Sequence, residues 1–288
     1  MKENLRIKFY CRSFDLRLYR ISKRFYKDLG YPCVRLTDQA ADEYFYTMLA
    51  DTDCDIAINV DEDCFISDPQ AVLDLADYVV ANGYANAGCP DGGGQTPRGG
   101  SPLVTNPFFN ILDLRQIRTK FSREAVKAFR YEDHKAAMIA AYPKERLETR
   151  YTFDRPEIIE PYYQFFLWLA ANFKTLYLPS RKHPDGWTTL LQDPAGHTLC
   201  AHSWLARFYS VPSFVAKHIQ RNVGKQKARI DALISETAAL RGITIPKETV
   251  WETLWYAGDK TLRWVIKVPQ RIAAWPAKYR RYHNSAQW

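Results

Sequence analysis

Three consecutive acidic residues, Asp61, Glu62 and Asp63, follow directly on an apolar stretch of the chain. Residues 54–60 before them and residues 64–66 after them are largely apolar, as in a protein core. Carboxylates in such a place are costly unless a cation or hydrogen-bond donors balance them. On an extended backbone, alternation puts Asp61 and Asp63 on one side and Glu62 on the other, so two carboxylates can converge on a hard divalent cation. The alternative is that the acids only solvate the end of a strand.

The segments before the acids determine where these carboxylates lie. Apolar periodicity predicts strands at residues 5–10, 32–36 and 54–60, with helices at 16–29 and 42–49 between them. The order β-α-β-α-β predicts a mainly parallel sheet with helices on its faces. Ligands of such open sheets bind at the carboxyl ends of the strands, which is where Asp61 and Asp63 stand.

The α/β alternation continues along the chain. Asp68 and Pro69 are a start signal for a helix over residues 69–80. A glycine- and proline-rich loop at residues 89–102 is a candidate lid or substrate rim. The remaining predicted elements are strands at 84–87, 108–114 and 175–178, helices at 124–129, 135–142 and 161–171, and a long basic helix within 214–240.

We therefore predict an α/β fold with a mixed, mainly parallel sheet flanked by helices and a helical C-terminal extension. The composition changes near residue 210, which predicts a sheet domain over residues 1–210 and an extension over residues 211–288. No internal repeat is visible in the sequence.

The chain is basic, with 40 Lys and Arg against 32 Asp and Glu in 288 residues and a net charge of +8. This balance favours anionic partners such as phosphates or lipid headgroups. The six cysteines are scattered without a C-x-x-C pair, which predicts a reduced, cytoplasmic setting. No uncharged run approaches the roughly 18 residues of a membrane span, and residues 1–10 lack a signal-peptide core.

The apolar strand that closes in Asp61-Glu62-Asp63 resembles the D-x-D strand of the GT-A glycosyltransferases, which ends at a nucleotide-sugar site. The resemblance covers residues 5–210 and implies a GT-A-like, Rossmann-like domain. Residues 1–105 would be its nucleotide-sugar half and residues 106–210 its acceptor half. Asp61 is then expected near the ribose and the metal, and Asp63 is expected to bind the metal and bridge to the diphosphate.

The implied activity is metal-dependent transfer of a sugar from a nucleotide-diphosphate sugar, expected to be UDP-linked, to a hydroxyl of a glycan or lipid-linked acceptor. The resemblance is to enzymes of bacterial cell-surface polysaccharide biosynthesis. The cofactor is expected to be Mn²⁺ or Mg²⁺. Two rival functions stay open: a nucleotidyltransferase, and a non-catalytic membrane-associated adaptor. Against the first, residues 5–30 hold only one glycine, Gly30, where a phosphate-binding loop would be glycine-rich.

The resemblance also suggests further site residues. Several GT-A families complete the metal shell with a late histidine, for which His202 is the candidate and His197 the fallback. Imidazole with carboxylates suits Mn²⁺. Arg207 is expected to neutralise the leaving diphosphate. Glu157 and Glu160 both precede the aromatic helix, and Glu160 is preferred as the candidate base; Asp91 is expected to contact the donor sugar. As alternatives, His202 is a hydrogen-bonded core histidine and Glu160 an acid favoured by the helix dipole.

Residues 261–282 interleave Trp and Tyr with Lys and Arg, as in a segment that lies on a membrane surface. Such a segment predicts peripheral contact with an anionic membrane, at the inner face for a cytoplasmic protein. The alternative is an amphipathic helix that closes over the catalytic domain. Nucleic acid is not expected as a partner, because no nucleic-acid module is recognisable.

Overall fold

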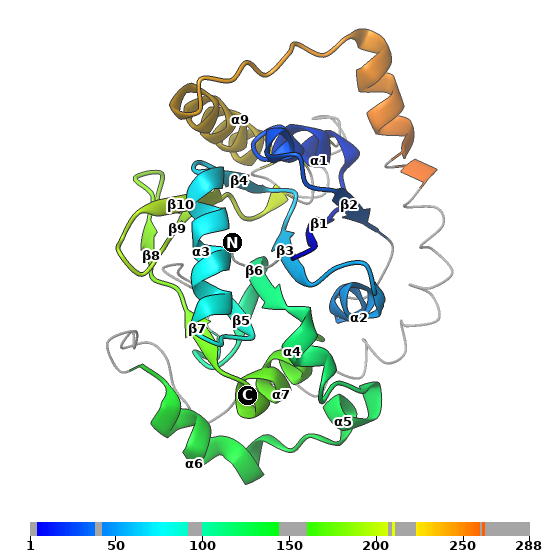
Figure 1. The fold of residues 1–288 in the computed structure, drawn as a ribbon. Helices are drawn as coiled ribbons and strands as arrows, with labels where there is room; N and C mark the ends of the chain where they lie inside the picture. Colours follow the sequence, from blue (N-terminus) through cyan, green and yellow to red (C-terminus); the bar gives the residue numbers. More distant parts are fainter. Residues whose placement is uncertain are drawn as a thin grey trace, which may run out of the picture.

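The computed structural model describes residues 5–37, 42–91, 100–143, 160–206, 209–210, 223–259 and 261–262 (Figure 1). Within them the chain forms a six-stranded sheet of order β2-β1-β3-β6-β5-β7 and a four-stranded sheet of order β4-β10-β9-β8. The first sheet is mixed and mainly parallel, helices flank it, and further helices follow toward the C-terminus. The predicted fold class is therefore confirmed.

The three N-terminal strands form the parallel part of the first sheet. β1 (Ile7–Arg12) pairs in parallel with both β2 (Cys33–Leu36) and β3 (Ile56–Val60). Every residue of β3 is buried, as expected of a continuous apolar strand covered on both faces. The carboxyl end of β3, and with it Asp61, therefore meets the end of β1.

The other half of this sheet contains the one strand that runs against the rest. β6 (Thr105–Asp113) pairs antiparallel with β3 and with β5 (Asn86–Pro90). β7 (Thr175–Tyr177) completes the edge in parallel with β5. β6 begins at Thr105, three residues earlier than predicted. β5 runs to Pro90, so the loop predicted at residues 89–102 begins later. Residues 92–99 of this loop lie outside the described part.

Two apolar clusters cover the two faces of the sheet. On one face pack α1 (Leu16–Lys23), α3 (Pro69–Ala81) and α9 (Val223–Leu240). On the other face pack α2 (Glu43–Ala50) and four further helices. These are α4 (Leu114–Arg118), α5 (Arg123–Ala128), α6 (Tyr131–Ala141) and the aromatic α7 (Tyr163–Asn172).

Local signals fixed several helix ends. The side chain of Asp68 accepts a hydrogen bond from the backbone N–H of Ala71, as an N-cap does, and α3 begins at Pro69 as predicted. The first helix is shorter than predicted: α1 stops at Lys23, and a 3-10 turn, η1 (Lys27–Leu29), leads to Gly30. Gly30 has a φ of 79°, a left-handed conformation that suits glycine.

The second sheet was not predicted from the sequence. Its strands are β4 (Cys64–Ile66), β8 (Ser180–Lys182), β9 (Thr189–Gln192) and β10 (Thr198–His202). Each has three to five residues, too few for periodicity to separate a strand from a loop. β10 pairs antiparallel with β4, which directly follows the three acids.

The C-terminal part continues the helical pattern. After α9 the chain forms a helix over residues 250–259. Of the predicted interfacial segment, residues 261–282, the structure describes only residues 261 and 262. The predicted division at residue 210 stays a prediction, although Ile230, Leu233 and Ile234 of α9 share a core with the sheet. Among the described residues, no helix is long and apolar enough to cross a membrane.

Candidate metal centre

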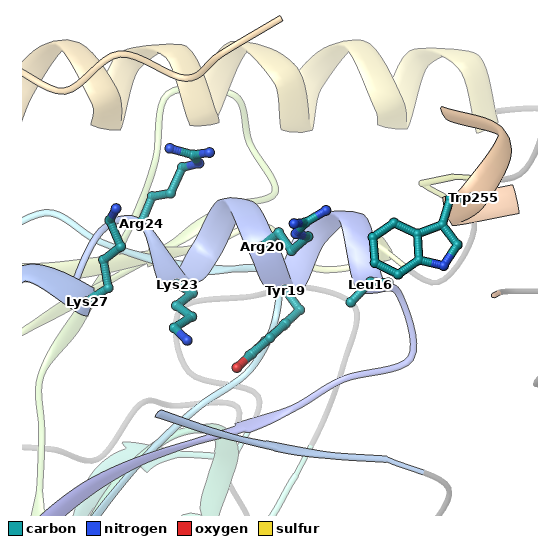
Figure 2. A pocket seen from close by; sticks show the side chains of 7 residues that line it. All are labelled: Leu16, Tyr19, Arg20, Lys23, Arg24, Lys27 and Trp255. Carbon is teal, nitrogen blue, oxygen red and sulfur yellow. The ribbon is translucent and has the colours of Figure 1, made fainter. Parts of the chain in front are cut away.

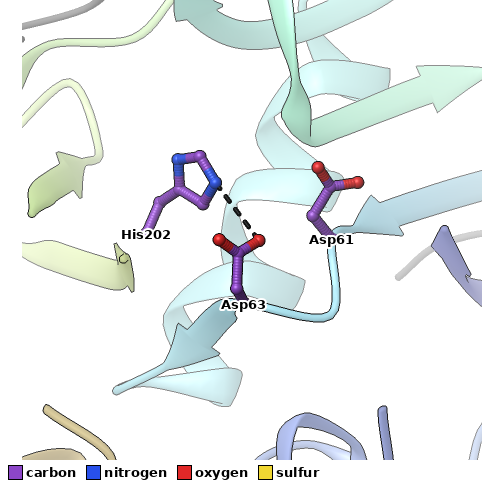
Figure 3. Close-up of side chains that lie close together, drawn as sticks. All are labelled: Asp61, Asp63 and His202. Atoms are coloured by element: carbon purple, nitrogen blue, oxygen red, sulfur yellow. Dashed lines mark ion pairs between the residues drawn. The ribbon is translucent and has the colours of Figure 1, made fainter. Parts of the chain in front are cut away.

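Asp61, Asp63 and His202 lie together at the carboxyl end of β3 (Figure 3). One potential ligand atom from each of the three residues lies within 4.8 Å of the other two. All three side chains are buried, with exposed fractions of 7%, 8% and 4%. These are the three residues predicted to form the metal shell.

Strand pairing in the second sheet brings the histidine to the acids. His202 is the last residue of β10 and lies opposite Cys64, the first residue of β4. Beyond this pair, the N–H of Ser203 donates to the carbonyl of Asp63 at 2.9 Å. His202 and Asp63 are consequently held side by side from two strands that are far apart in the sequence.

The three acids form a turn, so the expectation of an extended segment was wrong. The N–H of Cys64 donates to the carbonyl of Asp61 at 3.0 Å, which closes the turn between β3 and β4. The carboxylates nevertheless separate as predicted. Asp61 and Asp63 face His202, whereas Glu62 points toward the loop after β1.

Glu62 fixes this turn to the loop that joins β1 and α1. Its Oε2 accepts hydrogen bonds from Ser13 Oγ at 2.8 Å, Phe14 N at 2.9 Å and Asp15 N at 2.6 Å. Burial raises the pKa of Glu62 well above its usual range, and the nearby Asp15 carboxylate adds to this, while the donors act in the opposite direction. The N–H groups of Phe14 and Asp15 are thereby occupied by a side chain of the protein itself.

Arg12 neutralises part of the acidic charge. Its Nε donates to Asp61 Oδ1 at 3.0 Å and its guanidinium also donates to Asp61 Oδ2 at 2.6 Å. Burial raises the pKa of Asp61, and the Arg12 charge opposes this rise. Arg12 was not predicted as a site residue, although its place at the carboxyl end of the first strand is a signal that could have identified it.

Asp63 has a histidine and a serine as partners, where Asp61 has an arginine. Its Oδ1 lies 3.3 Å from His202 Nε2, and its Oδ2 accepts from Ser203 Oγ at 3.2 Å. Burial favours a higher pKa for Asp63, but His202 and Ser203 outweigh it and lower the pKa below its usual value. Asp63 is therefore the carboxylate of the pair that is more readily available to a cation.

Aromatic rings hold His202 in place. Its ring stacks on Phe108 with centroids 4.3 Å apart and an interplanar angle of 11°, and it also lies 4.3 Å from Trp204. The ring nitrogen that faces the acids is Nε2, which lies 3.3 Å from Asp63 Oδ1 (Figure 3). Nε2 is therefore the His202 atom that a cation between the carboxylates would contact.

The donor set fits a divalent cation. Asp61 and Asp63 bring two negative charges into a buried site, and Arg12 supplies one positive charge. A cation would compensate the remaining charge, and two carboxylates with one imidazole are a ligand set that suits Mn²⁺. The group could therefore hold a metal ion.

The chain after His202 turns through strained backbone. Trp204 and Leu205 each have a φ of 59°, which is uncommon for residues other than glycine. Arg229 of α9 supports this turn by donating to the carbonyls of Ser203 at 2.6 Å and Trp204 at 3.1 Å. Arg229 is a second positioning residue that the sequence did not reveal, since only the packing of α9 brings it here.

The other predicted site residues have different surroundings. Asp91 is fully buried, and its carboxylate accepts hydrogen bonds from Asn106, Tyr162 and Tyr163. Its predicted contact with the donor sugar is untested and stays a prediction. These three donors anchor the end of β5 to β6 and to the start of α7.

Glu160 and Arg207 also stay predictions. Glu160 precedes α7, and its carbonyl accepts from the N–H of Tyr163 at 3.1 Å, which places it at a helix start as expected. Its role as a base is untested. Arg207 lies outside the described residues.

Known proteins provide only distant comparisons. No protein-family model and no curated protein matches the chain. A solved structure of a protein from STIV aligns with 68% of this chain and 93% of its own, at 15% identity and a TM-score of 0.38. A glycosyltransferase involved in the glycosylation of the major capsid of PBCV-1 aligns with 51% of this chain and 80% of its own, at 12% identity and a TM-score of 0.29.

A cytidylyltransferase from Leptospira borgpetersenii serovar Hardjo-bovis is also similar. It aligns with 84% of this chain and 98% of its own, at 12% identity and a TM-score of 0.33. Similarities this weak assign no family to the chain.

Proposed function

We propose that this chain is a metal-dependent glycosyltransferase that moves a sugar from a nucleotide-diphosphate sugar to a hydroxyl of a glycan or lipid-linked acceptor. The observation that carries the proposal is the buried group of Asp61, Asp63 and His202 at the carboxyl end of β3. Ligands of open α/β sheets bind at this edge. Two carboxylates placed there can hold a cation together with the phosphate oxygens of a nucleotide.

Each residue of the centre has a distinct role in this proposal. Asp63 and His202 bind the metal, and Asp61 binds it or contacts the donor nucleotide. A metal held there would supply Lewis-acid stabilisation of the charge that develops on the leaving diphosphate. Arg12 opposes the rise in the pKa of Asp61 that burial causes, and it fixes the carboxylate in one orientation, because its guanidinium donates to both oxygens.

The acceptor must lose a proton during transfer. Glu160 is our candidate for the group that accepts it, since its place before α7 matches the expected position of the base. Asp91 is kept as a donor-sugar contact. Arg207 is proposed to meet the diphosphate.

The loop after β1 argues against the nucleotidyltransferase alternative. Such enzymes usually bind triphosphate through backbone N–H groups of a loop after the first strand. In this chain Glu62 already accepts hydrogen bonds from Phe14 N and Asp15 N. The corresponding loop therefore has fewer donors to offer a phosphate.

A thermal-shift screen of nucleotide diphosphates, with and without Mn²⁺, tests the proposal. One nucleotide should raise the melting temperature only when Mn²⁺ is present, because ligands that bind the folded state stabilise it. Asp63→Asn should abolish this gain. Asp53→Asn is the matched control, since the Asp53 side chain is 82% exposed, and it should retain the gain.

Turnover separates the enzyme from an adaptor. The wild-type chain should hydrolyse or transfer the sugar of the matching nucleotide-diphosphate sugar in a metal-dependent way. Full turnover in Asp63→Asn, or no response to any nucleotide with Mn²⁺, would refute the proposed function.

A further inference from the structure

The helix over residues 250–259 presents its apolar side to solvent. Trp251, Leu254 and Trp255 have the spacing of one helix face, and their side chains are 81%, 57% and 57% exposed. Val250 and Leu262, on either side, are 75% and 60% exposed. Large apolar side chains gathered on one exposed face are characteristic of a surface that contacts a partner.

The polar side of this helix faces the protein instead. The hydroxyl of Tyr256 accepts a hydrogen bond from Arg20 of α1 at 3.0 Å, and Tyr256 is buried. Asp259 forms an ion pair with Arg35 at 3.8 Å. Because these contacts fix which side points inward, the outward direction of Trp251 and Trp255 follows from the packing of the helix.

A row of cations borders this apolar face. Arg20, Lys23, Arg24 and Lys27 follow one another along α1 and into η1, and with Trp255 they line a pocket (Figure 2). Arg20 lies 5.3 Å from the centre of the Trp255 ring, which joins the basic row to the aromatic side chains.

Few acidic residues neutralise this row. Lys27 has Asp28 at 3.9 Å. Glu252 has a lowered pKa, mainly through hydrogen bonds from Thr249, with Arg20 and Arg24 contributing. In the described part of the chain, neither Lys23 nor Arg24 forms an ion pair, so the row keeps a net positive charge.

We propose that these side chains form a docking face for an anionic lipid membrane. The docking face consists of Trp251, Leu254, Trp255 and the four cations of α1 and η1. Tryptophan and leucine side chains enter the boundary between headgroups and acyl chains, and Lys and Arg meet anionic headgroups. The overall charge of +8 supports approach to such a surface.

Charge decides against a second copy as the occupant. A symmetric dimer through this face would bring the cations of two copies toward each other, and like charges oppose association. Nucleic acid would use the cations and the aromatic rings, but it offers no apolar partner for the aliphatic Val250, Leu254 and Leu262. A lipid surface is complementary to all these side chains at once.

A chain of polar contacts connects the docking face to the candidate metal centre. Asp259 pairs with Arg35, Arg35 Nε donates to Ser13 Oγ at 2.9 Å, and Ser13 Oγ donates to Glu62. The helix that carries the docking face is therefore linked, through Asp259, to the side chains that anchor the acidic turn. A membrane-bound acceptor would suit this arrangement, and that last point rests on the proposed function.

Sedimentation of the full chain with vesicles tests the docking face. The chain should sediment with vesicles of phosphatidylcholine and phosphatidylglycerol, and it should sediment less with phosphatidylcholine alone or at high salt. Lys23→Glu with Arg24→Glu should weaken binding by at least roughly 20-fold, because each lost cation reduces partitioning about fivefold. Trp251→Ser with Trp255→Ser should also abolish most of the binding.

Matched controls lie on the second sheet. Arg181→Glu with Lys182→Glu removes two adjacent exposed cations, and Trp187→Ser removes a tryptophan that is 40% exposed. Both should bind vesicles like the wild type. The metal-dependent thermal shift should be unchanged in all these variants, so failure of docking is distinguishable from failure of the proposed function.

Three results would overturn the docking proposal. The first is a wild-type chain that stays in the supernatant with anionic vesicles. The second is unchanged binding in both docking-face variants, with loss only on deletion of residues 263–288, because the tail would then be the membrane anchor. The third is a concentration-dependent dimer that Trp251→Ser with Trp255→Ser abolishes without any vesicle binding in the wild type.

Discussion

Arg12 and Asp61 form a two-point ion pair at the carboxyl ends of two adjacent parallel strands. The register that pairs Tyr10 of β1 with Asn59 of β3 also places these two residues opposite each other. Both oxygens of Asp61 are therefore occupied by one guanidinium. Asp63, which has no such partner, is left as the principal site for a metal.

Removal of Arg12 should destabilise the chain more than removal of an exposed arginine. In Arg12→Gln the buried Asp61 carboxylate loses its counter-charge, and we expect a loss of about 3 kcal/mol in the free energy of unfolding. Mn²⁺ should restore part of this loss, because a cation can replace the guanidinium. Urea unfolding with and without Mn²⁺ measures both effects.

Arg6→Gln is the matched control for this prediction. Arg6 also donates twice to a carboxylate, that of Asp55, but its side chain is 54% exposed. Its removal should cost about 1 kcal/mol or less. Equal losses in the two variants would show that the buried pair has no special role.

Loss of the imidazole should change the metal preference of the site. His202→Asn should weaken Mn²⁺ binding at least about tenfold. Even the loss of a residue that only supports a metal ligand weakens metal binding by about 10- to 100-fold. Mg²⁺ prefers oxygen ligands, so its affinity should fall less. Titration of free Mn²⁺ by electron paramagnetic resonance, with Mg²⁺ as competitor, measures the two affinities.

His197 is the control for His202. It lies on the hairpin before β10, its side chain is 76% exposed, and it contacts Asp193 at 3.1 Å. His197→Asn should bind Mn²⁺ like the wild type. If both variants bind alike, His202 is not a ligand.

Loss of the Glu62 carboxylate should lower both the free energy of unfolding and the affinity for Mn²⁺. Glu62→Ala leaves Phe14 N and Asp15 N without their acceptor, at a cost of about 1–3 kcal/mol for each unsatisfied donor. Glu62→Gln keeps an acceptor oxygen and should cost less. Because Glu62 anchors the turn that carries Asp61 and Asp63, the alanine variant should also bind Mn²⁺ more weakly.

Asp74→Ala provides the comparison for Glu62→Ala. Asp74 is exposed on α3 and accepts one hydrogen bond, from Gln70 at 2.9 Å. Its replacement should change the unfolding free energy by less than about 0.5 kcal/mol. A stable Glu62→Ala chain with unchanged Mn²⁺ affinity would contradict the anchoring role.

Acid should weaken the second sheet through Asp185. Burial favours a higher pKa for Asp185, but hydrogen bonds from Thr188 and Trp187 and the charge of Arg229 outweigh it and lower the pKa to about 2. The folded pKa lies below the unfolded value of 3.8, so the stabilisation is present above about pH 4 and is lost as the pH falls toward 2.

Unfolding in urea at a series of acidic pH values checks this dependence. Asp185→Asn should reduce stability at pH 5 and should flatten the fall in stability between about pH 4 and pH 2. Asp28→Asn, at a side chain that is 72% exposed, should leave the curve unchanged. A curve for Asp185→Asn parallel to that of the wild type would contradict the prediction.

The sequence by itself determined the alternation of strands and helices, because each of these elements depends mainly on residues within or next to it. The apolar run of β3 and the Asp68 cap of α3 lie within a few residues of the structure that they specify. The same holds for the placement of Asp61 and Asp63 at a strand end. Even the separation of Glu62 from the other two carboxylates was predicted correctly, although the segment is a turn.

Only the tertiary structure decided what surrounds these carboxylates. Ser203 contacts Asp63 across 140 residues of sequence, and Arg12 contacts Asp61 across 49. Strands as short as β4 and β10 carry too little periodicity to reveal that they pair. Their pairing depends on burial and hydrogen bonding between distant segments, and those interactions exist only once the chain has folded.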